Sequence, residues 1–443
     1  MVPRQLKLHP MALQFLGNKT QRFYFQDQGE RKSYVLIYGD EVEPLQGNAP
    51  TAGYTRINYR GRDGEIKNPS LVNKRSLEMY FLDVGQGDAA FVVTPNDTKI
   101  LVDGGLRDRA LGFIIWKYRL DIPGNTVTID HMFLSHADAD HVEGLIPLIE
   151  HPQITVNNIY HNGIGLFDSG FNTDLGNEVN GELVTKHSTL ADLNGFNLKG
   201  TFKKWVDAIK VRGINYHRLD KSTGILNIGD PNIRVEILGP ILKPNGAFEW
   251  FGGKSHTING HSLVFRMSYN HVRTFFSGDL NIEGSGLLLS QPDGALNVNA
   301  HVFKAPHHGS HEFDPNLFKA VNPMVTVVSS GEVPDHGHPR AKFLGAIGRA
   351  VRGEEPLLFS TALSALFVDD EDAEHVAASN IIEPTTLGDL DFSLSASNTV
   401  ARRRFKKILP GIINVRTDGE YIYAYRRVQM GYQWESYKMR YEN

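Results

Sequence analysis

The 443-residue sequence predicts an α+β protein in which a large mixed domain follows a small β domain. Three observations lead to this prediction. Short alternating strands with Gly and Asp turns fill residues 1–75. After residue 76, apolar strands recur with helices between them, which is typical of a sandwich of sheets and helices. His and Asp residues directly follow several of these strands, which indicates a site at the strand ends.

The composition excludes several classes of protein. With 41% apolar residues, 22% charged residues and a net charge of −4, the chain can bury a large core and is not a globally basic nucleic-acid binder. It has no cysteine, which excludes disulfides, thiolate ligands and a thiol nucleophile. No segment resembles a signal peptide or approaches the roughly 18 apolar residues of a membrane span, so we expect a cytoplasmic protein.

The segment of residues 1–75 contains the strand-like runs SYVLIYGDEVEPL and GYTRINYRGRDGEIKNPSL. These runs resemble small bacterial SH3-type barrels, in which such a strand leads into a G-x-x-G-x-I/V turn, here Gly61–Ile66. The resemblance implies a small N-terminal SH3-type β-barrel that offers a surface for a protein partner. The alternative is an irregular β extension packed on the main domain.

The main domain is expected at residues 76–368. Three apolar segments end at Asp83, Thr94 and Asp103, and LGFIIWKYRL, HMFLS and HVEGLIPLIEH then predict a helix, a strand and a helix. Further strands are expected in RVEILGP, HSLVFRMSY, VRTFFSGD, VNAHVFKAP and MVTVVSSG. A loop-rich insertion at 163–220 carries a helix in TFKKWVDAIKVRG.

Residues 369–443 are expected to form a connector and a C-terminal β extension packed on the main domain. The connector is acidic and rich in Ser and Thr, and GIINVRTDGEYIYAYRRV reads as strands. The basic run ARRRFKK at 401–407 is either charge on a helix surface or a patch that binds phosphates.

The stretch SHADADHVEG places His136, Asp138, Asp140 and His141 directly after a predicted buried strand. Alternate residues of an extended segment lie on one side, so His136 and Asp138 can reach a single cation. Asp140 and His141 follow at the turn and can face a second cation. Nitrogen and oxygen donors in this mix suit zinc, manganese or iron. Alternatively, the stretch is only a helix-capping loop with Asp140 as the N-cap.

Distant partners occur at other predicted strand ends. Asp279 follows FFSG, the paired His307 and His308 follow HVFKAP, and VTVVSSGEVPDHGHP contains His336 and His338. Two metal ions about 3.5–4 Å apart could hold a hydroxide and neutralise a phosphate or acyl oxygen. A structural role for one of the paired histidines is the alternative, and His336 reads as a solvated loop residue.

The order SHADADH, SGD, HHGS and GHP resembles the metallo-β-lactamase superfamily. LDVGQGD at Leu82–Asp88 and DGG at Asp103–Gly105 are similar to the hydrolase domain of ComEC, the competence DNA-uptake protein. The likeness covers residues 77–368 and extends to the strand-like Ile412–Gly419. It implies an αββα metallo-β-lactamase sandwich and a hydrolase, but no transport, because the channel helices of ComEC are absent.

The resemblance implies two divalent metal ions, zinc or manganese. One ligand would come from the run KSHTINGHSLVF, where Asn259 matches the ComEC pattern and His256 and His261 are the rivals. In this scheme Asp279 bridges the two ions. The implied ligands are His136, Asp138, Asp140, His141, Asn259, Asp279 and His338.

Other residues would support the reaction. By the resemblance, Asp140 belongs to the catalytic centre, and His307 or His308 would give a proton to the leaving oxygen or contact a phosphate. The turn that ends at Asp88 could offer backbone N–H groups to an anionic substrate. Asp83, Asp88 and Asp103 are expected behind the ligands, where Asp103 would orient a ligand histidine.

The expected function is therefore metal-dependent phosphodiester hydrolysis by a metal-bound hydroxide at a dinuclear site, with nucleic acid as the leading substrate and no role for a membrane. One alternative is hydrolysis of a small ester, lactone, thioester, lactam or cyclic nucleotide, which a narrow apolar pocket in the insertion would favour. Another is a non-catalytic metal-binding interaction module.

Overall fold

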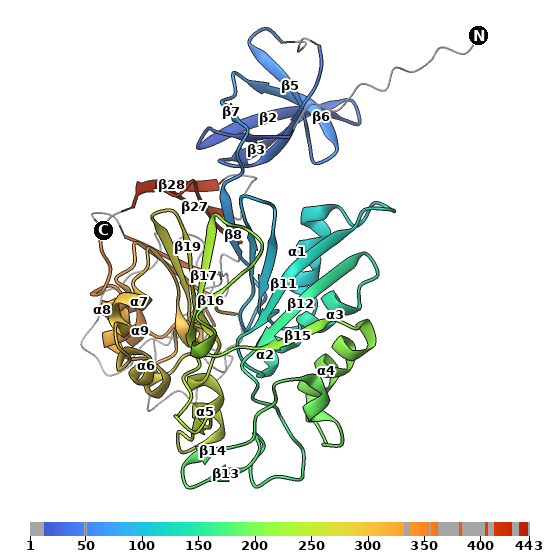
Figure 1. The fold of residues 1–443 in the computed structure, drawn as a ribbon. Helices are drawn as coiled ribbons and strands as arrows, with labels where there is room; N and C mark the ends of the chain where they lie inside the picture. Colours follow the sequence, from blue (N-terminus) through green and yellow to red (C-terminus); the bar gives the residue numbers. More distant parts are fainter. Residues whose placement is uncertain are drawn as a thin grey trace.

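Two large β-sheets lie face to face in the computed structural model, and helices cover their outer faces (Figure 1). The structure describes residues 13–47, 49, 51–331, 337–353, 356–361, 381–382, 404–405, 412–427 and 434–441. The layers follow the order helix, sheet, sheet, helix, which is the expected α+β sandwich.

The first sheet has nine strands in the order β15-β12-β11-β10-β9-β8-β26-β27-β28. β10, β11, β12 and β15 are parallel, and the remaining pairs are antiparallel. β26 lies beside β8, with Val415 opposite Met79, so strands from the C-terminal part of the chain complete this sheet. The strands are β8 (Leu77–Phe81), β9 (Ala90–Val93), β10 (Lys99–Val102), β11 (Val127–Leu134), β12 (Ile154–His161), β15 (Asn215–Arg218), β26 (Ile413–Thr417), β27 (Tyr421–Arg427) and β28 (Trp434–Arg440).

The second sheet has seven strands in the order β16-β17-β19-β20-β21-β22-β23. Its last four strands are parallel. Within the expected strand VNAHVFKAP, only Val302–Lys304 pairs, because Val298 ends a helix. The strands are β16 (Ile225–Leu226), β17 (Ile233–Gly239), β19 (Val264–Tyr269), β20 (Val272–Phe276), β21 (Val302–Lys304), β22 (Val325–Val328) and β23 (Leu357–Ser360).

Aromatic side chains fill the space between the two sheets. Phe265 stacks on Phe276 at 4.8 Å between ring centres and on Phe133 of the first sheet at 4.9 Å. Strands such as β8 are buried on both faces, since helices or loops cover the side that does not face the second sheet. This explains why they are continuous apolar runs rather than alternating ones. The rigid sandwich fixes where each strand ends, and hence where the loops begin.

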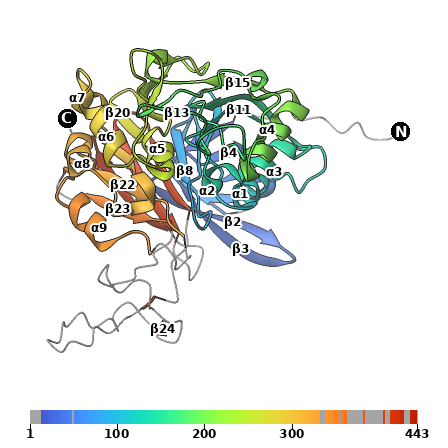
Figure 2. The ribbon, with the colours of Figure 1, turned by 90° about the horizontal axis from the view of Figure 1, so that it is seen from below.

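Helices cover both outer faces (Figure 2). In α4, Phe202, Trp205 and Ile209 recur at helical spacing and are buried, so one face packs on the first sheet and the other is solvated. The first sheet is covered by α1 (Arg109–Tyr118), α3 (Leu145–Glu150) and α4 (Gly200–Arg212). The second is covered by α6 (Ile282–Leu289), α7 (Gly294–Val298), α8 (Pro315–Val321) and α9 (Ala341–Ile347). The shorter elements are α2 (Ala139–Val142), α5 (Lys254–Gly260), η1 (Leu190–Leu193), η2 (Lys221–Thr223), η3 (Pro306–Gly309), β13 (Glu178–Val179), β14 (Glu182–Leu183), β18 (Phe248–Glu249), β24 (Ile381–Ile382) and β25 (Arg404–Phe405).

A separate antiparallel sheet forms from the N-terminal part of the chain and lies beyond one end of the sandwich (Figure 1). Its order is β3-β2-β6-β5-β4-β1-β7, around a small core that includes Phe23, Ile57 and Ile66. The SH3-type barrel is not confirmed, because β3 and β7 remain edges among the described residues and the sheet is not closed. The strands are β1 (Gln14–Leu16), β2 (Thr20–Asp27), β3 (Glu30–Ile37), β4 (Glu41–Pro44), β5 (Tyr54–Tyr59), β6 (Arg62–Lys67) and β7 (Leu71–Val72).

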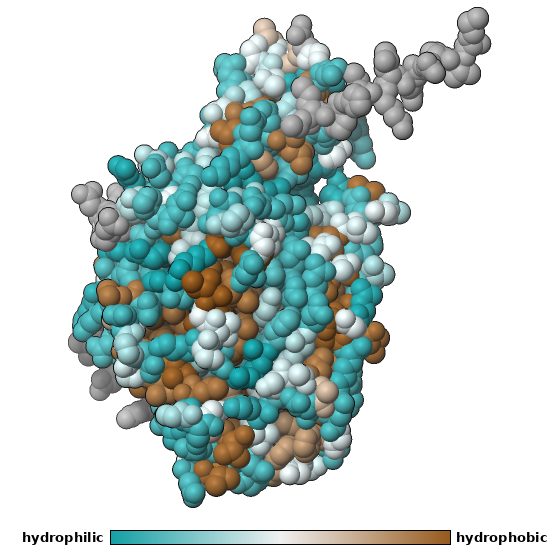
Figure 3. All heavy atoms as spheres, viewed as in Figure 1, coloured by the Kyte–Doolittle hydropathy of each residue, from teal (hydrophilic) through white to brown (hydrophobic). Residues whose placement is uncertain are grey.

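The surface and the tail bear on the remaining expectations. Polar residues cover much of the face seen in Figure 3, with smaller hydrophobic areas between them. In the described ranges, no helix is both long and apolar enough to span a bilayer. The acidic connector and the basic run at 401–407 fall largely outside the described residues, as does His336.

Candidate metal centre

The predicted ligands follow strands of both sheets. β11 ends at Leu134, and the chain then passes through the His/Asp loop into α2. β20 ends at Phe276, three residues before Asp279. β21 ends at Lys304, and η3 follows with His308. Because buried strands hold the start of each loop, the side chains of these loops meet at one place.

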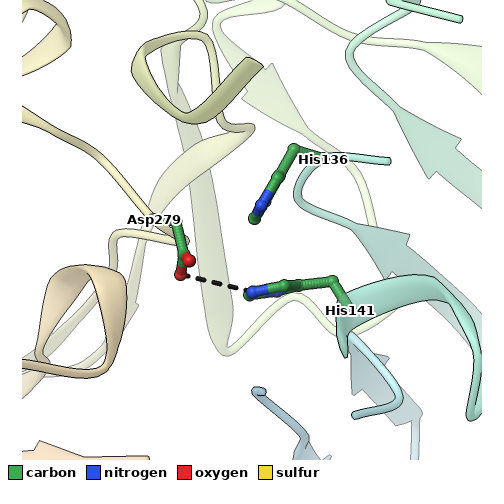
Figure 4. Close-up of side chains that lie close together, drawn as sticks. All are labelled: His136, His141 and Asp279. Atoms are coloured by element: carbon green, nitrogen blue, oxygen red, sulfur yellow. Dashed lines mark ion pairs between the residues drawn. The ribbon is translucent and has the colours of Figure 1, made fainter. Parts of the chain in front are cut away.

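His136, His141 and Asp279 point toward one another (Figure 4). The ring centres of the two histidines are 4.1 Å apart, and His141 Nε2 lies 3.3 Å from Asp279 Oδ1. All three side chains are buried, and one ligand atom from each lies within 4.8 Å of the others. Three donors at this spacing can bind a single cation.

Asp103 contacts the His141 ring at Nδ1, the nitrogen that faces away from Asp279. His141 Nδ1 lies 2.9 Å from Asp103 Oδ2, and the other carboxylate oxygen accepts a hydrogen bond of 2.7 Å from the backbone N–H of Ser135. In the neutral ring this contact places the proton on Nδ1, so Nε2 keeps its lone pair on the side of Asp279. A carboxylate behind an imidazole in this way commonly orients a metal-ligating histidine.

His308 enters the same cluster from η3. Its Nδ1 donates to the backbone oxygen of Ser329 at 3.0 Å, so Nε2 faces the carboxylates, 3.1 Å from Asp279 Oδ2 and 3.5 Å from Asp140 Oδ2. His307 and His308 both have left-handed backbone, with φ of 46° and 52°. For residues with a Cβ this costs about 1 kcal/mol or more each, so surrounding packing must maintain it. Such strain is characteristic of functional sites.

The charges of the cluster shift one another's pKa values. Burial lowers the pKa of His141 and His308, but the neighbouring carboxylates, Asp279 first, outweigh burial and raise both pKa values well above the usual one. Burial raises the pKa of Asp140 and Asp279, but the two imidazoles outweigh it, and both pKa values are lowered. The carboxylates are therefore ionised at neutral pH, and the histidines carry protons that a bound cation would displace.

A buried lysine that the sequence did not single out lies beside the cluster. Lys304 Nζ contacts Asp88 Oδ2, and Asp88 Oδ1 lies 3.2 Å from His308 Nδ1. Burial raises the pKa of Asp88, but Lys304 and His308 outweigh it and lower this pKa. A signal was present in the sequence, since a lysine inside the apolar strand β21 needs a buried partner.

The turn before β9 packs closely on α2. Gly87 has φ of 99°, and a Cβ at this position would lie 1.8 Å from the backbone oxygen of Asp140, so only glycine fits. Gln86 Nε2 lies 3.5 Å from Asp140 Oδ2. Asp83 Oδ1 accepts a hydrogen bond of 3.1 Å from the backbone N–H of Gly85. The turn thus forms one wall of the cluster, and Asp83 shapes the turn rather than entering the cluster.

Asn259, His261 and His256 face different surroundings. Asn259 is buried in α5, and its Oδ1 has no hydrogen-bond partner within the described part of the chain. His261 Nε2 lies 2.8 Å from the backbone oxygen of Glu249, and burial lowers the pKa of His261 to about 4. His256 Nδ1 lies 3.1 Å from Glu283 Oε1. Asn259 Oδ1 and His261 Nδ1 are thus both buried without a hydrogen-bond partner within the described residues, and His256 is the one of the three whose side chain is more exposed and paired with a carboxylate.

Asp138 and His338 lie at the margin of the cluster. Asp138 Oδ2 is 3.6 Å from His136 Nε2, and the side chain is 36% exposed. The ring of His338 lies 6.3 Å from that of His308. Neither residue belongs to a group, among the described residues, whose ligand atoms all lie within 4.8 Å of one another. Asp140 lies inside α2, whose N-cap is Asp138, so the alternative that Asp140 merely caps this helix is wrong.

The donor atoms fit a metal ion because several are buried without a partner. Leaving such an atom unpaired costs about 1–3 kcal/mol, so a ligand that pairs several of them is favoured. Nitrogen and oxygen donors of this kind suit divalent ions such as zinc or manganese. Among the residues that the structure describes, the atoms of the cluster that lack a hydrogen-bond partner are His136 Nε2, His141 Nε2, Asp279 Oδ1 and His308 Nε2.

Comparison with known proteins agrees with this geometry. The sequence profile of the metallo-beta-lactamase superfamily matches residues 82–314. Over 296 residues the chain is 24% identical to ComE operon protein 3 of Bacillus subtilis (strain 168). That alignment covers 63% of this chain and 31% of the relative, so the chain spans about a third of the length of the curated relative it matches.

Proposed function

The chain belongs to the metallo-β-lactamase superfamily, and on this premise we propose that it is a metal-dependent phosphodiesterase that cleaves nucleic acid. The observation that carries the proposal is the set of buried, unpartnered donor atoms around Asp279, found within the described residues. The choice of nucleic acid rests on the likeness of LDVGQGD and the motifs after it to the hydrolase domain of ComEC.

We propose that two divalent ions, zinc or manganese, bind here. His136, Asp138 and Asn259 would hold one ion, and Asp140 and His141 the other. Asp279 would contact both, since its two oxygens face different partners, His141 at 3.3 Å and His308 at 3.1 Å. His338 would complete the set around the second ion. When bound, the ions supply positive charge that acidifies a coordinated water and stabilises charge on a phosphoryl oxygen.

Residues of the chain would complete the chemistry. His308 Nε2 faces the carboxylates and its ring is fixed by Ser329, so this side chain can hold a proton close to a leaving oxygen or contact the phosphate. The ammonium group of Lys304 forms an ion pair with the carboxylate of Asp88 beside the metal centre, which lowers the pKa of Asp88 and holds its side chain in position. Asp103 keeps the ring of His141 in one orientation.

The cavity of the insertion does not support the small-substrate alternative. It has a volume of about 490 Å³ and is lined by residues such as Asp168, Phe196 and Lys203, with none of the metal-centre residues among them. A substrate held there would not reach Asp279. A polymer that crosses the centre from outside does not depend on this pocket.

The test is cleavage of single- and double-stranded DNA and RNA by chelator-stripped protein to which manganese, magnesium or zinc is returned. Asp140→Ala and His308→Ala should each abolish cleavage, because one removes a ligand and the other the proton-bearing ring. Asp207→Ala and His217→Ala change the same residue types at exposed positions and should cleave normally.

Other outcomes of this cleavage test would change the proposal. Loss with Asp140→Ala alone would keep the metal centre and make His308 structural. Cleavage of esters or cyclic nucleotides, but of no polynucleotide, would replace the nuclease proposal by the small-substrate one. Metal binding without hydrolysis of any of these substrates would favour a non-catalytic module.

A further inference from the structure

The N-terminal sheet carries tyrosines and cations together on one face. In β2, Phe23 and Phe25 are buried in the core, so Arg22 and Tyr24 point to the opposite face. On that face the strand register places Tyr24 opposite Glu65 of β6. The same register places Glu65 opposite Arg56 and Lys67 opposite Tyr54 of β5. We call this surface the tyrosine face and define it by Arg22, Tyr24, Arg31, Tyr54, Arg56 and Lys67.

The two tyrosines form one aromatic platform. Their ring centres are 6.2 Å apart in an edge-to-face arrangement, and both side chains are partly exposed. The guanidinium of Arg31, from the neighbouring strand β3, lies 4.3 Å from the centre of the Tyr24 ring. The rings are therefore supported by neighbours on the sheet, and little ordering would be needed for a further flat group to stack on them.

Positive charge prevails on the tyrosine face although the whole chain has a net charge of −4. The face has four basic side chains by its definition, and by the same register it has three acids, Glu65, Asp63 near the β5–β6 turn and Glu43 of the neighbouring strand β4. Glu65 is already paired with Arg31 at 2.9 Å. Phosphate groups along this face would therefore meet an excess of Arg and Lys, chiefly Arg22, Arg56 and Lys67.

We propose that the tyrosine face binds single-stranded nucleic acid, with bases stacked on Tyr24 and Tyr54 and phosphates paired with the surrounding cations. Aromatic rings interleaved with basic residues on a sheet are the chemistry that binds unpaired strands with little sequence preference. A duplex hides its base faces, and a protein partner would not need both stacking rings and a phosphate-matched charge. The inference rests on the proposed function, because the face would bind the nucleic acid that the metal centre cleaves.

The place of this face defines its role. In Figure 1 the N-terminal sheet lies above the sandwich, whereas α2, which carries Asp140 and His141, lies in the lower half of the sandwich. The tyrosine face therefore cannot touch the bond that is cleaved. It would instead retain a long strand while another part of the same strand reaches the metal centre, and it would contribute nothing to cleavage of a dinucleotide.

The test measures binding without cleavage. Full-length protein in excess chelator is titrated into fluorescein-labelled oligo(dT) and oligo(U) of about 20 nucleotides, long enough for one such site, and anisotropy is recorded at several salt concentrations. Tyr24→Ala/Tyr54→Ala should weaken binding about 10-fold or more. Tyr24→Phe/Tyr54→Phe should bind as the wild type does, because stacking needs the ring and not the hydroxyl. Arg22→Ala/Lys67→Ala should lower the slope of log affinity against log salt by about 1.4, for two phosphate contacts.

The same anisotropy titration includes a control variant on another surface of the protein. Lys203→Ala/Lys204→Ala removes two exposed cations from α4 and should leave binding unchanged. The inference is overturned if the wild type binds neither oligonucleotide, if the alanine pair binds as tightly as the wild type, or if the phenylalanine pair, folded by circular dichroism, binds no better than the alanine pair. Because the chelator removes any metal-dependent cleavage, binding can succeed while the proposed nuclease fails, and the reverse.

Discussion

In the described part of the molecule, the buried charges at the junction with the N-terminal sheet and those at the candidate metal centre differ in how completely their polar atoms are paired. At the junction of the first sheet with the N-terminal sheet, Arg416 of β26 donates to Asp40 at 2.8 Å and to the hydroxyl of Tyr80 at 3.0 Å. Tyr80 in turn contacts Glu78, and Lys117 donates to both Glu78 at 3.2 Å and Tyr80 at 2.8 Å. Within the described residues, none of these side chains has a buried polar atom without a partner.

The metal centre is built differently. Four carboxylates gather there, but one lysine is the sole permanent cation that contacts them among the described residues. Buried atoms such as His136 Nε2 and Asp279 Oδ1 have no hydrogen-bond partner in the same described ranges. A complete network stabilises the fold, whereas an incomplete one with excess negative charge is suited to bind cations. This difference distinguishes a structural cluster from a functional one.

The largest expected effect is the loss of cleavage activity on substitution of Asp279 in the metal centre. Asp279→Asn should reduce phosphodiester cleavage by about 1000-fold or more, because it removes the carboxylate common to both proposed ions. The free energy of unfolding of the metal-free protein should fall less than in the junction variant below, since the histidines can release their protons once the carboxylate is lost. Cleavage rates and urea titrations measure the two quantities. Cleavage that survives in Asp279→Asn would remove this residue from the centre.

The junction should show the reverse behaviour. Arg416→Met leaves Asp40 without its cation and removes one of the three cations around Glu78, and it should lower the free energy of unfolding by about 3–5 kcal/mol. Cleavage per folded molecule should remain within a few-fold of the wild type. Arg349→Met, at an exposed arginine, provides the matched control in the urea titration. A loss no larger than that of the control would mean that the junction network does not stabilise the fold.

The sequence predicted the metal centre far better than the junction. SHADADH places four donors within six residues, and SGD and HHGS follow apolar strands whose ends a sandwich brings together. The position of His308 Nε2 was less accessible, since it depends on left-handed backbone at two consecutive histidines. Arg416 gave no signal at all, because its partner Asp40 is 376 residues away and no local pattern relates them.

Acid titration distinguishes the junction further. Burial raises the pKa of Glu78, but Lys117, Arg416 and Arg75 outweigh it and lower this pKa to about 2 from an ordinary value of 4.5. Because the pKa is lowered in the folded state, this stabilisation is fully present above pH 4.5 and is lost as the pH falls toward 2. It amounts to on the order of 3 kcal/mol.

The matched variant for this titration is Glu78→Gln. The difference in unfolding free energy between the wild type and Glu78→Gln, measured in chelator, should be constant above pH 4.5 and shrink as the pH approaches 2. A difference that stays constant across this range would show that Glu78 does not titrate with a lowered pKa.

The smallest expected effect concerns two neighbours of the centre. Asn259→Ala should weaken manganese or zinc binding by about 10-fold or more, because it removes a buried oxygen without another partner. With Asn259 as the ligand, His261→Ala should change affinity less, although only the Nε2 of this ring is engaged, by the backbone oxygen of Glu249, and its Nδ1 is buried without a hydrogen-bond partner within the described residues. Isothermal titration of both variants measures the contrast. Weaker binding by His261→Ala than by Asn259→Ala would assign the ligand to His261.

The most direct measurement is the number of divalent ions bound per chain, by mass spectrometry of chelator-stripped protein reloaded with manganese or zinc. The account predicts two ions in the wild type and in Arg416→Met, and fewer than two in Asp279→Asn. Binding of no ion by the wild type, or an unchanged count in Asp279→Asn, would contradict the claim that the unpartnered atoms of this cluster form a metal centre.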